Sequence, residues 1–322
     1  MIAAIFSIAL TTFLMALSAA HGFEPTKPVE MIVHSAPGGG SDLFARALVE
    51  MLQKENLYTK PMPVLNKSGG SGAVAISHLA DKKGDTHTIG LFTSAVIFGS
   101  LTQKEAPHTI QELTPIVHMV LEPSVAAVRA DAPYKSMKDF VEAAKKNPGK
   151  LMQAGGVVTS VDNMFRLLIQ KAAGAQWSYI NLVNGADRIV NVLGGNMDLM
   201  LENPDKVSEY VRAGKMRVIA SLTEKRLSTF PDVPTILEQG ISIPILTQSR
   251  GVIAPPAIPA EVVSYWENIF GRLVKTPRWK KYVEENQQES YFLPSRELAK
   301  FLDEQTKLLR VVLKDAGVKT VR

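Results

Sequence analysis

The amino-acid sequence predicts an α/β protein of two lobes, each a largely parallel sheet flanked by helices. From residue 29 onward, short apolar runs alternate with amphipathic segments of helical period, which is typical of βαβ units. The alternation restarts near residue 124, and each series opens with a glycine-rich turn between a strand and a helix. Of the 322 residues, 46% are hydrophobic and 21% charged, so the chain can bury a sizeable core.

The first series contains three strand–helix units. In order, we expect strand 29–35, helix 41–54, strand 62–66, a glycine-rich turn at 66–72 that enters a second helix, strand 87–92, and a helix from about Ser94. The helix 41–54 carries apolar residues along one side, at Leu43, Ala47, Leu48, Met51 and Leu52. That stripe predicts a helix packed on a sheet.

The second series repeats this design. Residues 124–134 predict a strand and a turn, and 136–148 a helix capped by Ser136. Segment 149–174 again reads as strand, glycines, hydroxyl residues and helix. The remaining segments are expected as strands at 178–182, 197–202 and 216–222, helices at 186–195 and 205–214, a strand, proline-rich turn and helix over 250–274, and a helical tail over 277–316.

The order of these units predicts where the lobes divide. We expect residues 23–122 and 251–322 to form the first lobe and residues 123–250 the second. The chain would then cross between the lobes twice, near 122 and near 251. Two such crossings make a hinged pair with a cleft between the lobes, which is where ligands commonly bind.

The first 22 residues differ from the rest. They contain no Lys, Arg, Asp or Glu, and an apolar run leads into small residues. This pattern predicts a secretory signal peptide over 1–22, removed after Ala20 or Gly22. A membrane anchor is the alternative, but the run is short and is interrupted by Ser7 and Thr11–Thr12. The mature protein is expected to begin near Phe23, outside the cytoplasmic membrane.

Three glycine-rich turns, at 36–42, 66–72 and 154–160, each precede a helix. The first N–H groups of a helix lack internal partners and carry partial positive charge, so such a turn can bind an anion without a charged side chain. We expect the N–H groups of residues 38–40 to act in this way. The alternative is that each turn only connects a strand to a helix; three in corresponding places favour a shared ligand site.

Two acidic residues lie in first helical turns, and one histidine precedes the first glycine turn. Asp42 and Asp162 suit the helix dipole and are expected to brace their loops, with metal ligation as the lesser alternative. His34 is expected to have a hydrogen-bond partner within the protein rather than to contact a ligand.

Several classes of function lack support. The chain has no cysteine, and none of its six histidines lies in H-x-x-x-H or H-x-E spacing, so no cofactor or metal is expected. The glycine turns match neither the phosphate-binding motif G-x-x-x-x-G-K-[ST] nor the dinucleotide-binding motif G-x-G-x-x-G. The stretch "GGSGA" lacks the G-x-S-x-G pattern of serine hydrolases. Net charge is +5, with basic residues spread along the chain, which does not indicate nucleic-acid binding.

Longer motifs resemble one family. The stretches "KPVEMIVHSAPGGGSD", "NKSGGSGAVA", "AGGVVTSVDNM", "LGGNMDLMLENPDKV", "AGKMRVIASLTEKRLSTFPDVPTILEQG" and "RGVIAPPAIPAEVVSYWE" resemble the Bug family, the extracytoplasmic solute receptors of tripartite tricarboxylate transporters. The resemblance covers essentially the whole chain after the leader.

The resemblance implies a periplasmic-binding-protein (Venus flytrap) fold without catalytic activity. It implies a monomer in the periplasm that captures a small mono-, di- or tricarboxylate and delivers it to the membrane subunits of such a transporter. A ligand sensor for a signalling kinase is the alternative, and an enzyme built on the same cleft is a third possibility.

The resemblance also implies the site, in which backbone, hydroxyl groups and ordered waters hold a ligand carboxylate. Carried over by position, the site residues are Pro37, Gly38, Gly39, Ser41, Asp42, Ser68, Gly69, Gly70 and Thr93 in the first lobe, Gly155, Gly156, Thr159, Ser160, Asp162 and Asn203 in the second, and Arg250 in the returning crossover. The chain departs from the usual pattern at His34, at Val157–Val158, and in "NLVNGA", which lacks a lysine. These departures favour a ligand with one carboxylate and a less polar far end.

Overall fold

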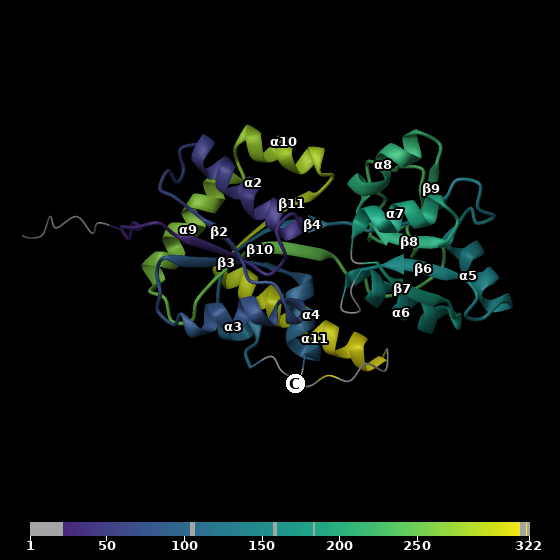
Figure 1. Cartoon of the computed structure of the whole chain (residues 1–322), viewed down its shortest axis with the longest axis horizontal. Helices are drawn as coiled ribbons and strands as arrows, with labels where there is room; N and C mark the ends of the chain where they lie inside the picture. Colours follow the sequence, from purple (N-terminus) through teal and green to yellow (C-terminus); the bar gives the residue numbers. More distant parts are fainter. Residues whose placement is uncertain (1–21, 104–106, 157–159, 183, 316–319, 321–322) are drawn as a thin grey trace, which may run out of the picture.

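The computed structural model describes residues 22–103, 107–156, 160–182, 184–315 and 320. Figure 1 shows two lobes side by side, each with a sheet between helices. The two-lobed α/β fold is therefore confirmed. The expected signal peptide lies outside the described residues except for Gly22.

The first lobe holds a six-stranded sheet in the order β11-β4-β10-β3-β1-β2. Its strands are β1 (Glu30–Val33), β2 (Val64–Asn66), β3 (Thr88–Thr93), β4 (Thr114–Glu122), β10 (Gln248–Ala254) and β11 (Glu289–Pro294). Its helices are α2 (Gly40–Lys54), η1 (Gly70–Gly72), α3 (Ala73–Asp81), α4 (Ser94–Thr102), η2 (Ile110–Glu112), α9 (Ala260–Leu273), α10 (Pro277–Glu285) and α11 (Ser295–Asp315).

The second lobe holds a five-stranded sheet in the order β7-β6-β8-β5-β9. Its strands are β5 (Val125–Arg129), β6 (Met152–Gly155), β7 (Ser178–Asn181), β8 (Leu199–Glu202) and β9 (Met216–Ser221). Its helices are α5 (Met137–Lys146), α6 (Val161–Ala173), α7 (Gly185–Leu193) and α8 (Pro204–Arg212).

The expectation of largely parallel sheets was wrong, because both sheets are mixed. β1 pairs in parallel with β2 and β3, and β6 with β7 and β8, as βαβ units require. The strands next to the crossings run the other way: β10 is antiparallel to β3 and β4, and β5 is antiparallel to β8 and β9. A strand that returns from the opposite lobe enters the sheet from the opposite end, which reverses its direction.

The helical tail expected over 277–316 is interrupted by β11, which pairs antiparallel with β4. The aromatic and apolar residues Tyr291–Leu293 favour a strand there. The charged and amide residues on either side interrupt the apolar pattern, so the strand is not evident from the sequence.

The core of the first lobe follows the alternation of side chains along β1. Met31 and Val33 point to the face covered by α2, α9 and α10, whereas Ile32 points to the face covered by α3, α4 and α11. Both faces are therefore buried, and helix α2 is fixed with its N-terminus at the end of β1.

The carboxyl ends of the parallel strands meet at one edge of each sheet. In the first lobe β1, β2, β3 and β4 run in the same direction, and in the second β6, β7, β8 and β9 do. Only Pro123 and Ser124 separate the end of β4 from the start of β5, so the two edges adjoin. Ligands of open α/β sheets bind outside carboxyl ends.

The lobe limits given above stay a prediction. The return from the second lobe ends by Gln248, where β10 begins, slightly before the expected position near 251. In this sheet Arg250 pairs in register with Thr93 of β3. Among the described residues, no helix combines the length and the apolar character that spanning a bilayer requires.

Candidate functional site

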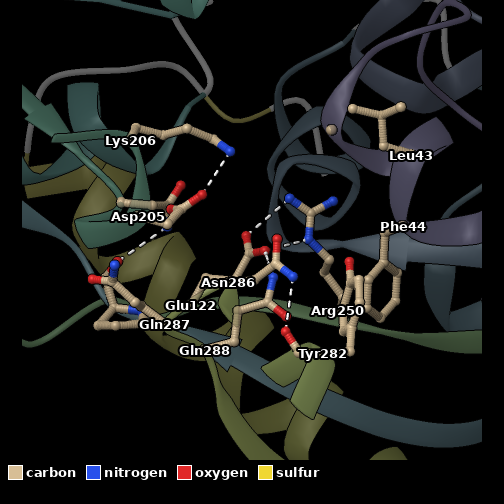
Figure 2. Close-up of a pocket in the computed structure, with 13 residues that line it drawn as sticks. Leu43, Phe44, Glu122, Asp205, Lys206, Arg250, Tyr282, Asn286, Gln287 and Gln288 are labelled. Atoms are coloured by element: carbon tan, nitrogen blue, oxygen red, sulfur yellow. Dashed lines mark hydrogen bonds and ion pairs between the residues drawn. The ribbon is translucent and has the colours of Figure 1, made fainter. Parts of the chain in front are cut away.

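A pocket of about 100 Å³ lies between the lobes (Figure 2). The first lobe contributes Gly40, Leu43, Phe44, Glu122, Arg250, Tyr282 and Asn286–Gln288, the crossing contributes Pro123, and the second lobe contributes Asn203, Asp205 and Lys206. Of the residues expected at the site, Asn203 and Arg250 line this pocket directly. Gly40, the last glycine of the first turn, lies beside them.

The first glycine turn is braced by Asp42. This buried carboxylate accepts hydrogen bonds from the amide of Gly38 (2.9 Å) and the side-chain amide of Asn66 (2.9 Å), and it pairs with Arg46 (3.0 Å). The hydrogen bond from Arg46, together with those from Gly38 and Asn66, overcomes the effect of burial and lowers the pKa of Asp42 to about 2. Asp42 therefore acts on the loop, as expected from its place in the first helical turn.

Of the three glycine amides of 38–40 that were expected to bind an anion, two have partners within the protein. The amide of Gly38 is used by Asp42, and that of Gly39 donates to the carbonyl of Ala36 (3.0 Å) within the turn. Gly38 has φ +77°, a conformation that favours glycine. No described residue accepts a hydrogen bond from the amides of Gly40 and Ser41, the first two residues of α2. These two donors remain available.

A buried ion pair lies behind this turn. The Arg250 guanidinium contacts the Glu122 carboxylate at both oxygens (2.7 and 2.9 Å) and donates to the hydroxyl of Ser41 (3.1 Å). Burial works against the charge, but the Glu122 carboxylate holds the pKa of Arg250 above its usual range. Since Glu122 neutralises it, Arg250 orients Ser41 rather than offering an unpaired positive charge.

His34 supports the same hydroxyl groups. Its Nε2 lies 3.2 Å from the hydroxyl of Thr93 and 3.4 Å from that of Ser41. Burial and the charge of Arg250 lower the pKa of His34 to about 4. The imidazole is therefore neutral at pH 7. As expected, His34 has partners within the protein.

The other first-lobe residues of the expected site lie apart from this pocket. Gly70 borders a different hollow, formed by α3 and the segment after α4. Ser68 and Gly69 line neither hollow, and Pro37 is exposed at the tip of the first turn. The turn 66–72 is not brought to the pocket in this structure.

The second-lobe turn uses the same kind of brace. Asp162, in the first turn of α6, accepts from the amide of Gly156 (3.0 Å) and from the hydroxyl of Tyr179 (2.9 Å), which also lies 3.2 Å from the hydroxyl of Ser160. Burial and the charge of Asp162 raise the pKa of Tyr179, so its hydroxyl keeps its proton. A Cβ on Gly155 would lie 2.2 Å from the Tyr179 ring, which explains the glycine there. Thr159 and Val157–Val158 lie outside the described residues.

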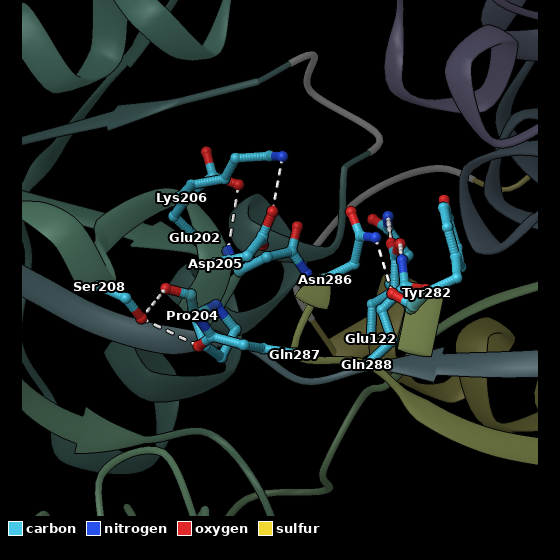
Figure 3. A network of polar contacts seen from close by, with 12 residues as sticks. Glu122, Glu202, Pro204, Asp205, Lys206, Ser208, Tyr282, Asn286, Gln287 and Gln288 are labelled. Carbon is cyan, nitrogen blue, oxygen red and sulfur yellow. Dashed lines mark hydrogen bonds and ion pairs between the residues drawn. The ribbon is translucent and has the colours of Figure 1, made fainter. Parts of the chain in front are cut away.

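Asn203 occupies the N-cap position of α8 without a capping hydrogen bond from its side chain, which instead donates to the carbonyl of Pro123 (3.0 Å). Close by, the hydroxyl of Ser208 donates to the Gln287 side chain (2.9 Å), and Gln288 donates to Glu122 (2.6 Å) (Figure 3). The second lobe is thus joined to the first by hydrogen bonds beside the pocket.

The residues of these networks that were not expected from the sequence include Glu122, Tyr179, Arg188 and Glu202. The side chains of Arg188 and Glu202 are 16% and 10% exposed, and they form an ion pair of 2.8 Å in the second lobe. Glu122 and Glu202 are each the last residue of a strand, and this position was the one feature of the sequence that could have marked them as site residues. Their arginine partners are distant in sequence or lie in another element, so no spacing pattern shows the pairs.

Residues 44–318 match the model of the tripartite tricarboxylate transporter family receptor, TctC. The chain belongs to this family. It is 26% identical over 295 residues to the UPF0065 protein in the gbd 5′ region of Cupriavidus necator, covering 91% of this chain and 89% of that one. It is 27% identical over 242 residues to protein BugT of Bordetella pertussis, covering 74% of each. The resemblance to the Bug family is thereby confirmed.

Solved structures of similar fold agree. The periplasmic binding protein BugD superposes with a TM-score of 0.79 at 25% identity, over 92% of this chain and 99% of that one. Rpa4515 of R. palustris with adipate gives 0.82 at 21% identity, over 92% and 99%. MatC of Rhodopseudomonas palustris with bound malate gives 0.76 at 19% identity, over 90% and 100%. These likenesses identify the fold of this TctC receptor as that of the periplasmic solute-binding proteins.

Proposed function

We propose that this TctC receptor is a periplasmic, non-enzymatic protein that binds a small organic acid and delivers it to the membrane subunits of a tripartite tricarboxylate transporter. The proposal is carried by one observation: at the N-terminus of α2, beside a pocket between the lobes, the amides of Gly40 and Ser41 have no hydrogen-bond acceptor among the described residues. An anion is the natural ligand of such a helix end. The adipate and malate held by two proteins of the same fold support a carboxylate.

In the proposed complex, one ligand carboxylate accepts from the amides of Gly40 and Ser41 and from the hydroxyls of Ser41 and Thr93. Asn203 meets the ligand from the second lobe. Asp42, Asp162 and Arg250 act indirectly, since their charged atoms already have partners within the protein. No metal or cofactor takes part, and the receptor works as a monomer.

A thermal-shift screen of mono-, di- and tricarboxylates, with and without chelator, tests this function. A ligand that binds only the folded state stabilises it by about 2.7 kcal/mol at 100 times its Kd. We expect at least one acid to raise the midpoint, with the same shift in chelator. If neutral sugars raise the midpoint and no acid does, the proposed function is wrong.

Export is tested separately, by mass spectrometry of the protein recovered from a periplasmic extract. We expect a mature chain that begins near Phe23. Retention of Met1 in the recovered protein would contradict the proposed location.

A further inference from the structure

The second-lobe turn has an arginine of its own, Arg188 of α7. We propose that Arg188 binds a second carboxylate of the ligand, so that the receptor takes a dicarboxylate whose ends lie on opposite lobes. This inference rests on the proposed function. It replaces the sequence-based expectation of a less polar far end.

Arg188 lies at the part of the second lobe that faces the first. β6, β7 and β8 are parallel, so Gly155, Asn181 and Glu202 end at the same edge of the sheet. A Cβ on Gly156 would lie 3.2 Å from Nη1 of Arg188, and one on Gly185 would lie 3.2 Å from Nη2. The guanidinium therefore rests against bare backbone at the glycine turn.

Arg188 and Arg250 differ in how many of their donors are used. Arg250 employs Nε and Nη2 on Glu122 and Nη1 on Ser41. Arg188 contacts Glu202 through Nη2 (2.8 Å), and its buried Nε has no hydrogen-bond partner among the described residues. A guanidinium has five N–H donors in a fork that fits a carboxylate, and buried donors are normally satisfied. A ligand carboxylate is the group that would complete this set.

Glu202 connects Arg188 to the pocket. Its carboxylate holds the guanidinium in place and accepts from the amide of Asn203 (3.1 Å), and Asn203 lines the pocket. Burial raises the pKa of Glu202, although Arg188 opposes this. The ion pair uses Nη2 of Arg188 and leaves its Nε for a second carboxylate, which would share the guanidinium with Glu202.

The test compares matched acids by calorimetric titration: succinate with butyrate, glutarate with pentanoate, and adipate with hexanoate. We expect the wild-type receptor to bind one diacid at least about tenfold more tightly than its monoacid. In Arg188→Gln, affinity for that diacid should fall about ten- to a hundredfold, the worth of hydrogen bonds to a charged group, with monoacid affinity unchanged.

Two variants serve as controls. Arg129→Gln removes the same charge from the second lobe at a surface pair with Asp131, and should leave diacid selectivity intact. Glu202→Gln keeps Arg188 but releases it from its ion pair, and should tighten diacid binding several-fold. Circular dichroism shows whether Arg188→Gln folds. If it does not, Glu202→Gln still tests the role of Arg188.

The outcomes are distinct. Equal loss of diacid and monoacid affinity in Arg188→Gln, or Glu202→Gln that leaves diacid affinity unchanged, would overturn the role of Arg188. Wild-type preference for a monoacid would overturn the dicarboxylate class. Failure of every acid to bind wild-type protein would instead overturn the proposed carboxylate receptor.

Discussion

The two lobes brace the N-termini of α2 and α6 in the same way but use their arginines differently. In each, an aspartate of the first helical turn accepts the amide of a loop glycine, from Gly38 to Asp42 and from Gly156 to Asp162. In the first lobe, each of the three guanidinium nitrogens of Arg250 donates a hydrogen bond, to Glu122 or to Ser41. In the second lobe, Arg188 has one ion-pair partner among the described residues, and its buried Nε has no hydrogen-bond partner there.

This difference separates two tasks. The first lobe offers neutral backbone donors on a support whose charges are internally balanced, which suits any carboxylate. In the second lobe, Nε of Arg188 is a buried donor without a partner in the part of the chain that the structure describes. An acid that cannot accept from it leaves it unsatisfied and should bind more weakly than an acid that can, so this lobe is suited to discriminate among acids. We therefore expect the first lobe to decide affinity for carboxylates in general and the second to decide selectivity.

The largest expected effect comes from Glu122→Gln. This change leaves Arg250 buried with a neutral partner, and breaking a buried pair costs about 3–5 kcal/mol. Glu202→Gln should cost about 1–2 kcal/mol, because Arg188 is more exposed and already less completely paired. Urea denaturation followed by circular dichroism measures both. Equal losses would show that the two pairs do not differ in the way described.

Gly40→Pro is expected to weaken acid binding about ten- to a hundredfold, because it removes one free donor to a charged group. The residue opens α2, where proline is well tolerated, and Gly39 before it is extended (φ −71°, ψ 160°). Gly40→Ala keeps the N–H, and its Cβ would meet Arg250 at an ordinary 3.5 Å, so its affinity should stay near wild type. Calorimetry in which both variants bind equally would place the anion elsewhere.

Because the imidazole of His34 is neutral at pH 7, we expect it to lower the free energy of unfolding by up to about 2 kcal/mol when the pH falls from 7 to 5. Its pKa falls from 6.5 to about 4 on folding, so the unfolded state takes up a proton that the folded state refuses. The contribution of His34 to stability is complete above pH 6.5 and is lost as pH falls toward 4. The melting temperature of His34→Asn, measured against pH, should fall less steeply with acidification than that of the wild type. Some pH dependence should remain, because burial also lowers the pKa of His118 to about 4.

The smallest effect distinguishes the two braces. Asp42→Asn should destabilise by about 1–2 kcal/mol, because Asp42 serves Gly38, Asn66 and Arg46. Asp162→Asn should cost less, since Asp162 serves Gly156 and Tyr179. Thermal melts at pH 7 give both values. A larger loss in Asp162→Asn would reverse this order.

The sequence was sufficient for the local units and insufficient for what joins them. Strand–helix units such as β1–α2 and β6–α6 were predictable because apolar periodicity and glycine turns are encoded within some 25 residues. β11 was missed because its strand signal, Tyr291–Leu293, stands among polar residues and becomes a strand through its pairing with β4. The reversed direction of β10 likewise follows from the crossing, not from its own residues.

The same division applies to the site. The turns and Asp42 could be located from the sequence, but not which amides are free, since the bond from Gly39 to Ala36 depends on turn geometry. The pairing of Glu122 with Arg250 joins two distant strands, and that of Arg188 with Glu202 joins a helix to a strand. Such contacts are set by tertiary structure.

The shortness of the link at Pro123–Ser124 has a consequence for how ligands compete. Residues Glu122 and Val125 can be no more than about 11 Å apart, so in the proposed complex the two half-sites act as binding modules joined by a very short linker. Once an acid is held by one lobe, its meeting with the other is intramolecular and takes place at a high effective concentration. An acid able to engage both lobes gains this advantage by geometry alone. An acid that binds only one lobe lacks this advantage, and its dissociation rate is set by its contacts with that lobe alone.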